Sequence, residues 1–235
     1  MDLEELLQRA AILKQNRPQA RSGATWYRVT ARQGEAEVYL YDEIGAFGIT
    51  AQAFVQELAQ LDADSIRLHL NSPGGDVFDG IAIYNALKAH RAQVNVQVDS
   101  LAASIASVVA MAGDRVEIAG NAQVMIHDAR GLAIGTADDM RELAELLDAS
   151  SDIIAAIYQA RAGGQTRSWR KAMKAITWYR GKEAVDAGLA DAVFTPAPQR
   201  AGFVQQLDEQ LPATPATIDY ASLFREAMEA QEVLT

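Results

Sequence analysis

Two short segments of the sequence alternate strictly between apolar and polar residues, and the stretch between them has the length of a helix. The first is "IRLHL" at 66–70 and the second is "VNVQV" at 94–98. Successive side chains of a strand point to opposite faces, so this alternation is typical of a strand with one buried face. Residues 77–90, which lie between the two, are expected to form a helix. Strand, helix and strand in this order indicate an α/β fold.

The same order continues along the chain and predicts one α/β domain with largely parallel strands. Further strands are expected at 38–41, 116–118 and 123–126, and further helices at about 50–61 and 102–112.

A longer helix is expected to begin after Thr136. The segment "TADD" fits a capping box, with Thr136 as the N-cap and Asp139 three residues later. Apolar residues then recur at helical spacing, at Met140, Leu143, Leu147, Ile154 and Ile157.

We divide the chain into three parts. Residues 1–24 are expected to hold an N-terminal helix and a polar linker, and residues 25–195 the α/β domain. Residues 196–235 are expected to hold a proline-containing linker and a C-terminal helix, because four of the six prolines lie there. Two interpretations of this last helix stay open, since it either packs on the same domain or binds a partner.

Composition excludes several classes of function. The chain has no cysteine, which rules out disulfides, zinc–thiolate sites and thiol nucleophiles. Its net charge of −10 disfavours a surface built for nucleic acid. The first 15 residues lack the order of a secretory signal, and the longest apolar run, 100–113, is too short to span a bilayer. We therefore expect a cytoplasmic protein with no membrane partner.

That apolar run, "SLAASIASVVAMAG", contains Ser104 near its start. A serine there is either the N-cap of a buried helix or a nucleophile, and a nucleophile needs a base within reach and donors for an oxyanion. The chain has three histidines. His69 lies on the polar face of its strand and His90 ends a helix, so both have structural explanations. His127 directly follows the strand at 123–126, where catalytic side chains are commonly displayed.

The segment "LNSPGGDVFDG" at 70–80 is a strand-to-helix turn with two adjacent glycines. Glycines permit unusual backbone angles and close approach of a ligand to bare N–H groups, which suits an oxyanion site. A simple tight turn explains the same residues equally well.

Together these motifs resemble the Clp protease proteolytic subunit family, and most closely its phage branch of head maturation proteases. The resemblance runs from about Leu40 to Val193, with Ser104 preceding His127 by 23 residues. It is carried by five ordered blocks: "YDEIGAFGIT", "LNSPGGDVFDGIAIYNAL", "VDSLAASIASVVAMAGD", "NAQVMIH" and "GKEAVDAGLAD". It implies that 25–195 is a Clp-like protease domain, with the Clp protease/crotonase-like fold of repeated strand–strand–helix units and a projecting long helix.

The resemblance also implies a function and a site. Ser104 is expected to be the nucleophile, His127 the general base, and the N–H groups of Gly75 and Ile105 the oxyanion hole. The implied activity is peptide-bond hydrolysis by a serine-type endopeptidase without metal or cofactor, in phage capsid or scaffold maturation within the host cytoplasm. "GLAIGTADDM" is similar to the family's element that joins rings of subunits, so a homo-oligomeric ring and a polypeptide substrate are expected. The family also admits an ATPase partner.

One position departs from the family's pattern. The acid that completes its triad aligns with Ile176, and Lys174 occupies the other position where an acid is expected. Three interpretations stay open: the alignment slips and Asp186, Asp191 or Asp128 serves; a Ser–His dyad works alone; or the chain is a catalytically impaired module kept for assembly. The nearby basic residues are interpreted as a solvated helix face: Arg167, Arg170, Lys171 and Lys174. Acyl-CoA enzymes of the crotonase type share the architecture but need neither Ser104 nor His127.

Overall fold

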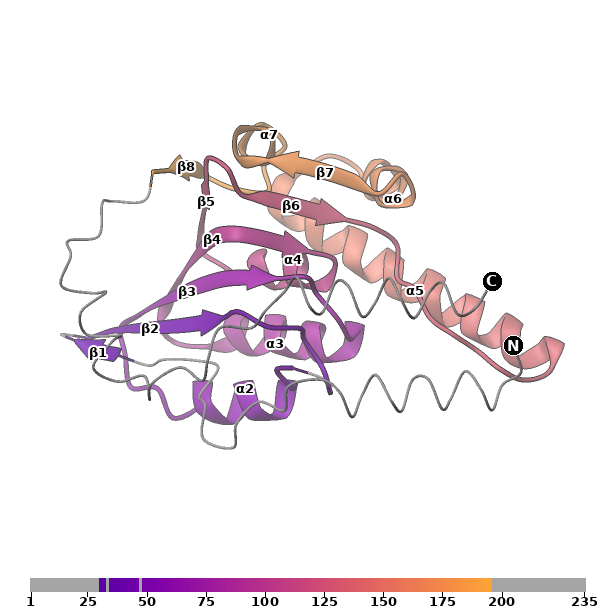
Figure 1. The fold of residues 1–235 in the computed structure, drawn as a ribbon, viewed down its shortest axis with the longest axis horizontal. Helices are drawn as coiled ribbons and strands as arrows, with labels where there is room; N and C mark the ends of the chain where they lie inside the picture. Colours follow the sequence, from indigo (N-terminus) through magenta and orange to yellow (C-terminus); the bar gives the residue numbers. More distant parts are fainter. Residues whose placement is uncertain (1–29, 33, 47, 196–235) are drawn as a thin grey trace, which may run out of the picture. The chain divides into compact units, whose positions relative to one another are not determined.

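The structure is a computed structural model that describes residues 30–32, 34–46 and 48–195 (Figure 1). The helix and linker expected in 1–24, and the linker and helix expected in 196–235, lie outside the described residues. In chain order the elements are β1 (Thr30–Arg32), β2 (Glu35–Leu40), α2 (Ala51–Leu58), β3 (Ser65–Ser72), α3 (Val77–Ala89), β4 (Gln93–Ala103), α4 (Ile105–Ala110), β5 (Arg115–Ala119), β6 (Gln123–Ile126), α5 (Ala137–Ala162), α6 (Thr166–Lys174), β7 (Thr177–Arg180), α7 (Gly181–Asp186) and β8 (Ala192–Phe194).

The strands of the described part form one sheet in which parallel pairing dominates. The main order is β1-β2-β3-β4-β5-β8, and β6 and β7 branch from it because β6 pairs with β4. All pairings are parallel except β1 with β2 and β6 with β7. The prediction of an α/β fold with largely parallel strands is therefore confirmed.

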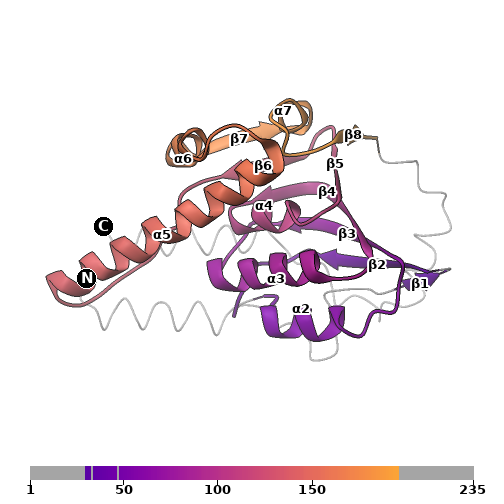
Figure 2. The ribbon, with the colours of Figure 1, turned by 180° about the vertical axis from the view of Figure 1, so that it is seen from behind.

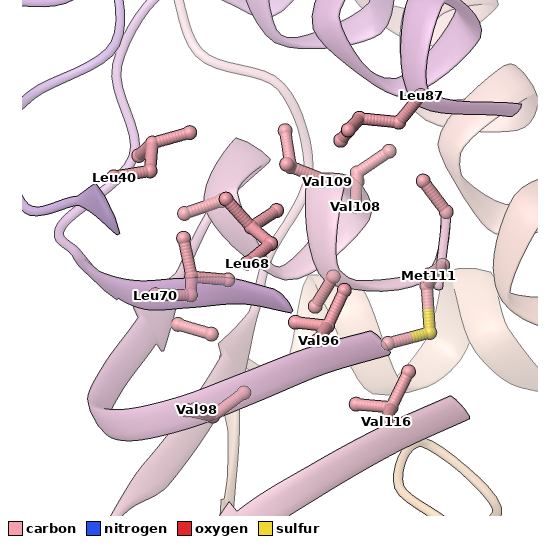
Figure 3. Close-up of a cluster of buried hydrophobic side chains, with 14 of the residues drawn as sticks. Leu40, Leu68, Leu70, Leu87, Val96, Val98, Val108, Val109, Met111 and Val116 are labelled. Atoms are coloured by element: carbon pink, nitrogen blue, oxygen red, sulfur yellow. The ribbon is translucent and has the colours of Figure 1, made fainter. Parts of the chain in front are cut away.

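Helices α2, α3 and α4 cover one face of this sheet (Figure 2). Strands β2, β3 and β6 bury alternate residues along their whole length, and β3 does so over all eight of its residues. Helix α4 is buried at every position, which agrees with its lack of a polar face. Figure 3 shows the resulting core, in which side chains from β2, β3, β4 and β5 meet those of α3 and α4.

The helix expected at 102–112 begins later than predicted. Residues Leu101–Ala103 extend β4 and pair with Gln123–Met125 of β6, so the helix covers only Ile105–Ala110. The apolar run therefore changes from strand to helix at Ser104. An unbroken apolar stretch has no periodicity that locates such a change.

Helix α5 is the projecting long helix. The capping box at Thr136 is present, with the hydroxyl accepting from Asp139 N–H and the Asp139 carboxylate accepting from Thr136 N–H. The second half of α5 packs near α4 and β6, whereas its first turns extend beyond the sheet (Figures 1 and 2). Apolar side chains stay exposed on α5 and on the segment before it: Leu132, Ile134, Met140, Leu146 and Ile153.

Candidate active site

Ser104 is the single residue between strand β4 and helix α4. Its backbone has φ 56° and ψ −130°, a conformation that costs free energy in any residue except glycine. Its side chain makes no capping hydrogen bond to α4. The N-cap position is thus occupied by a serine whose hydroxyl is directed elsewhere.

The hydroxyl of Ser104 meets the imidazole of His127. The distance from Ser104 Oγ to His127 Nε2 is 2.7 Å, well within hydrogen-bond range. The pairing of β4 with β6 brings the two residues together, since Ser104 N–H donates to the carbonyl of Met125 at 2.8 Å. His127 follows the end of β6 by one residue, so the two side chains emerge side by side from neighbouring parallel strands.

Gly75 and Ile105 line the same small cavity as Ser104 and His127, with a volume of about 80 Å³. Gly75 has φ +147°, and a Cβ there would lie 1.9 Å from the carbonyl oxygen of Ile44. Its N–H donates no hydrogen bond within the described residues. Ile105 is the first residue of α4, where helix N–H groups have no intrahelical acceptor. The structure thus brings all four residues predicted from the sequence into one cavity.

The Gly-Gly turn is held in place by Ser72, which the sequence analysis did not single out. The buried Ser72 hydroxyl donates to the carbonyl of Asp42 at 2.6 Å and accepts from Gly74 N–H at 3.1 Å. A Cβ on Gly74 would lie 2.7 Å from the Cβ of Ser104. The turn therefore packs tightly against Ser104. Glycine is required at both positions, because the backbone angles are unfavourable for other residues and a Cβ would clash with neighbouring atoms.

The electrostatics around His127 favour a neutral imidazole. Burial lowers its pKa below the usual 6.5, and the positive charge of Arg130 acts in the same direction. The backbone and the carboxylate of Asp128 act against this lowering. Because the net direction is downward, His127 is neutral at neutral pH and is able to accept a proton there.

Ile176 lies at the position that the alignment assigned to the acid. In the β6–β7 ladder the last pair is Ile126 with Thr177, so His127 and Ile176 are the next residues on the two strands. Asp186 and Asp191, two of the alternative acids, are engaged elsewhere. Asp186 pairs with Lys182 at 2.7 Å, and Asp191 pairs with Arg161 and accepts from Val116 N–H.

The third alternative, Asp128, is next to His127 and pairs with Arg170 of α6. Arg170 is only 12% exposed, and its guanidinium reaches the carboxylates of Asp128 at 3.4 Å, Asp148 at 2.9 Å and Asp152 at 3.2 Å. The interpretation of the basic cluster as a wholly solvated face is therefore wrong for Arg170. Its partners lie 18 to 42 residues away in sequence (170 − 152 and 170 − 128), so sequence spacing alone does not reveal them.

The other two histidines have structural partners. His69 Nδ1 lies 2.9 Å from Asp99 Oδ2, and the imidazole stacks on the ring of Tyr39. His90 is the C-cap of α3, and its Nδ1 accepts from Ala92 N–H at 3.1 Å. Neither approaches Ser104, which leaves His127 as the base candidate.

A larger cavity of about 400 Å³ adjoins the small one and shares Gly75, Val77, Ala129 and Arg130 with it. Three leucines of α5 form one wall: Leu143, Leu146 and Leu147. The small cavity that contains Ser104 and His127 is therefore adjacent to a larger cavity whose walls are largely apolar.

Within the described ranges, no three His, Asp or Glu side chains converge to hold a metal ion. None of the helices there is long and apolar enough to cross a lipid bilayer.

The geometry fits the class of serine hydrolases. A serine lies beside a histidine, and two N–H groups line the same cavity of a largely parallel α/β fold. The family model of Clp protease matches residues 21–197 of the chain. The ATP-dependent Clp protease proteolytic subunit of Ligilactobacillus salivarius (strain UCC118) is 32% identical over 149 residues, which are 61% of this chain and 76% of that protein. The chain therefore belongs to the Clp protease family, and its fold is the Clp protease fold.

Proposed function

We propose that the chain is a serine endopeptidase with Ser104 as nucleophile and His127 as general base. The observation that carries this proposal is the 2.7 Å hydrogen bond between Ser104 Oγ and His127 Nε2. Membership of the Clp protease family supports the same reaction class, and the lowered pKa of His127 supports its role as a base near neutral pH.

In the proposed reaction, Ser104 Oγ attacks the carbonyl carbon of the scissile peptide bond while His127 Nε2 takes the hydroxyl proton. The N–H groups of Gly75 and Ile105 donate to the oxyanion that forms. The C–N bond then breaks and His127 returns the proton to the leaving amine, which leaves an acyl group on Ser104. Water attacks this ester with His127 again as base, and collapse releases the carboxylic acid and restores the serine.

The proposed substrate is a polypeptide, specifically a capsid or scaffold protein of a phage. The resemblance of the sequence blocks to the phage branch supports this choice. The leucine wall of the 400 Å³ cavity suits an apolar substrate side chain next to the scissile bond.

We further propose a homo-oligomer assembled through α5. Leu132 is 80% exposed and Ile134 is 61% exposed, and with the exposed side chains of α5 they form an apolar surface that a second copy would cover. Native mass measurement tests this part, since replacement of Leu132 and Ile134 by serine is expected to shift the mass toward that of smaller species.

A second candidate function is that of a catalytically impaired assembly module. The observation that favours it is Ile176, which offers no hydrogen-bond acceptor beside His127. Loss of the acid from a catalytic triad lowers the rate by about 10⁴-fold and leaves residual activity.

Labelling with a serine-reactive fluorophosphonate separates the two candidates. Wild-type protein is expected to be labelled, and Ser104→Ala and His127→Ala to lose the label. Ser100→Ala, at an exposed position within strand β4, and His90→Ala are matched controls that are expected to keep it. The tryptic peptide 92–115 contains Ser100, Ser104 and Ser107, so fragmentation of that peptide locates the adduct. An unlabelled wild-type protein with an intact oligomer would support the assembly module.

A further inference from the structure

Two buried polar side-chain atoms in the described part of the chain have no hydrogen-bond partner, and they belong to consecutive residues. They are Nδ1 of His127 and Oδ1 of Asp128. Buried polar atoms without partners are rare in folded proteins, and each one calls for an explanation. Both residues line the small cavity that contains Ser104.

The two atoms are chemically complementary. When His127 Nε2 accepts the hydrogen bond of Ser104, the neutral ring carries its proton on Nδ1, which is then a donor. A carboxylate oxygen only accepts. The unpartnered donor of His127 and the unpartnered acceptor of Asp128 therefore satisfy each other if they meet.

Arg170 determines which oxygen of Asp128 is free. Its guanidinium pairs with Oδ2 at 3.4 Å, so that Oδ1 is the oxygen left without a partner. Arg170 also pairs with Asp148 and Asp152 of α5, and its side chain is 12% exposed. A charge as enclosed as this one keeps its position, since moving it would leave the partly buried carboxylate of Asp128 unpaired.

Ile176 occupies the position where the family's catalytic acid is expected, and it supplies no hydrogen-bond acceptor for His127. It follows the last pair of the β6–β7 ladder opposite His127, and its hydrocarbon side chain neither accepts a hydrogen bond nor carries charge. The imidazolium that forms during proposed catalysis is therefore without a carboxylate on that side. Within the described residues, the charges that shift the pKa of His127 are the positive Arg130 and the negative Asp128.

We propose that Asp128 is the positioning residue that replaces the missing acid: its Oδ1 accepts a hydrogen bond from His127 Nδ1–H in the substrate complex while Arg170 holds Oδ2. This inference rests on the proposed function. When Ser104 transfers its proton to Nε2, the ring becomes a cation with N–H groups at both nitrogens. The carboxylate of Asp128 accepts from Nδ1–H and stabilises the cation without taking the proton from it.

The test is the second-order rate of inactivation by a fluorophosphonate, measured against pH on the full-length protein. Asp128→Asn keeps the shape of the side chain and removes its charge, and its rate is expected to fall by about 10²- to 10⁴-fold. The midpoint of its pH profile is expected to move to lower pH, because the negative charge that raises the pKa of His127 is gone. The charge of Asp128 acts on His127 even without a hydrogen bond, so the readout that reports positioning is the rate at pH well above both midpoints, where the imidazole is neutral in both proteins.

Asp152→Asn is the matched control, because Asp152 of α5 pairs with the same guanidinium and does not line the cavity of Ser104 and His127. Its rate is expected to stay within about threefold of wild type, the scale of a lost exposed ion pair. An equal loss in both variants would overturn the proposal, because the effect would then pass through Arg170 and not through the carboxylate beside the base.

Ile176→Asp gives a readout that does not require Asp128→Asn to fold. If Asp128 already supplies the carboxylate, Ile176→Asp alone is expected to change the rate by less than about threefold and to recover most of the loss in the Asp128→Asn background. A gain on the scale of about 10²-fold or more in the otherwise wild-type chain would show that no acid serves His127 and would overturn the proposal. A wild-type protein that is not labelled at all refutes the proposed function, whereas labelling that is indifferent to Asp128→Asn refutes this inference alone.

Discussion

His127 and Ile176 are the first residues beyond the last cross-strand pair of the β6–β7 ladder, one on each strand. The residue opposite the base candidate is therefore a β-branched hydrocarbon. Its φ is 53°, in the left-handed region that β-branched residues rarely enter. The place where the family carries an acid thus combines the wrong chemistry with a strained backbone.

The strain at Ile176 predicts that a smaller polar residue stabilises the fold. We expect Ile176→Asn to raise the free energy of unfolding by about 1 kcal/mol, because asparagine tolerates the left-handed region far better than isoleucine. Little burial is lost, since Ile176 is 44% exposed. The measurement is the denaturant midpoint, with Val193→Asn as the control. Val193 is equally exposed but lies in strand β8, so its replacement is expected to give no gain. Equal effects at the two positions would contradict the strain argument.

Arg130 provides a prediction for the pH dependence. Its positive charge lowers the pKa of His127, so Arg130→Gln is expected to raise that pKa. The protonated, inactive form of the imidazole then persists to higher pH, and the midpoint of the labelling profile shifts upward. Arg141→Gln removes an exposed arginine of α5 that pairs with Asp138, and is expected to leave the midpoint unchanged. A downward shift in Arg130→Gln would refute this account of the site's electrostatics.

The glycine turn provides a steric prediction. A Cβ on Gly75 would lie 1.9 Å from the carbonyl oxygen of Ile44, a distance that forces backbone to move. We expect Gly75→Ala to abolish fluorophosphonate labelling and to lower thermal stability. Gly120→Ala is the control, because the nearest atom to its added Cβ is Val193 Cγ1 at 3.6 Å, an ordinary contact. If Gly75→Ala is labelled at the wild-type rate, the turn is not part of the reactive cavity.

Tyr158 provides a prediction about the hydrogen bonds that connect it, through Ser107, to the backbone of Ser104. Ser107 Oγ donates to the Ser104 carbonyl at 2.5 Å and lies 2.7 Å from the buried Tyr158 hydroxyl. Tyr158→Phe removes one hydrogen bond and is expected to lower stability by about 1 kcal/mol, while Ser107 keeps its bond to Ser104 and labelling continues. Tyr179→Phe removes a hydroxyl that has no hydrogen bond in the part of the chain the structure describes, and thermal melts are expected to show no loss.

The periodic parts of the fold could be predicted from the sequence. The strands at 66–70 and 94–98 have one buried face, and the capping residues of α5 are only three positions apart in sequence, so local pattern was sufficient for both. The start of α4 could not be placed in the same way. Pairing of Leu101–Ala103 with β6 determines where it begins, and that pairing depends on residues about 20 positions later.

The functional site, too, could be predicted only where its signal is local in the sequence. Ser104 and His127 could be selected because each adjoins a strand end, and Gly75 because of its glycine turn. The role of Ser72 could not be predicted, because the carbonyl to which its hydroxyl donates, that of Asp42, lies in a loop 30 residues earlier. The burial of Arg170 depends on three carboxylates from two separate segments, and charge spacing within one helix does not predict such a convergence.

Strand β4 pairs with β5 along its first half and with β6 along its second half, and Ser104 N–H bonds to the Met125 carbonyl. The separation of Ser104 and His127 is therefore determined by main-chain hydrogen bonds, which are insensitive to the identity of the side chains around them. In evolutionary terms, a lineage that retains this ladder also retains the spacing of the pair. Position 176 is then free to drift, and an acid can be lost there, or regained from another segment, without rebuilding the rest of the site.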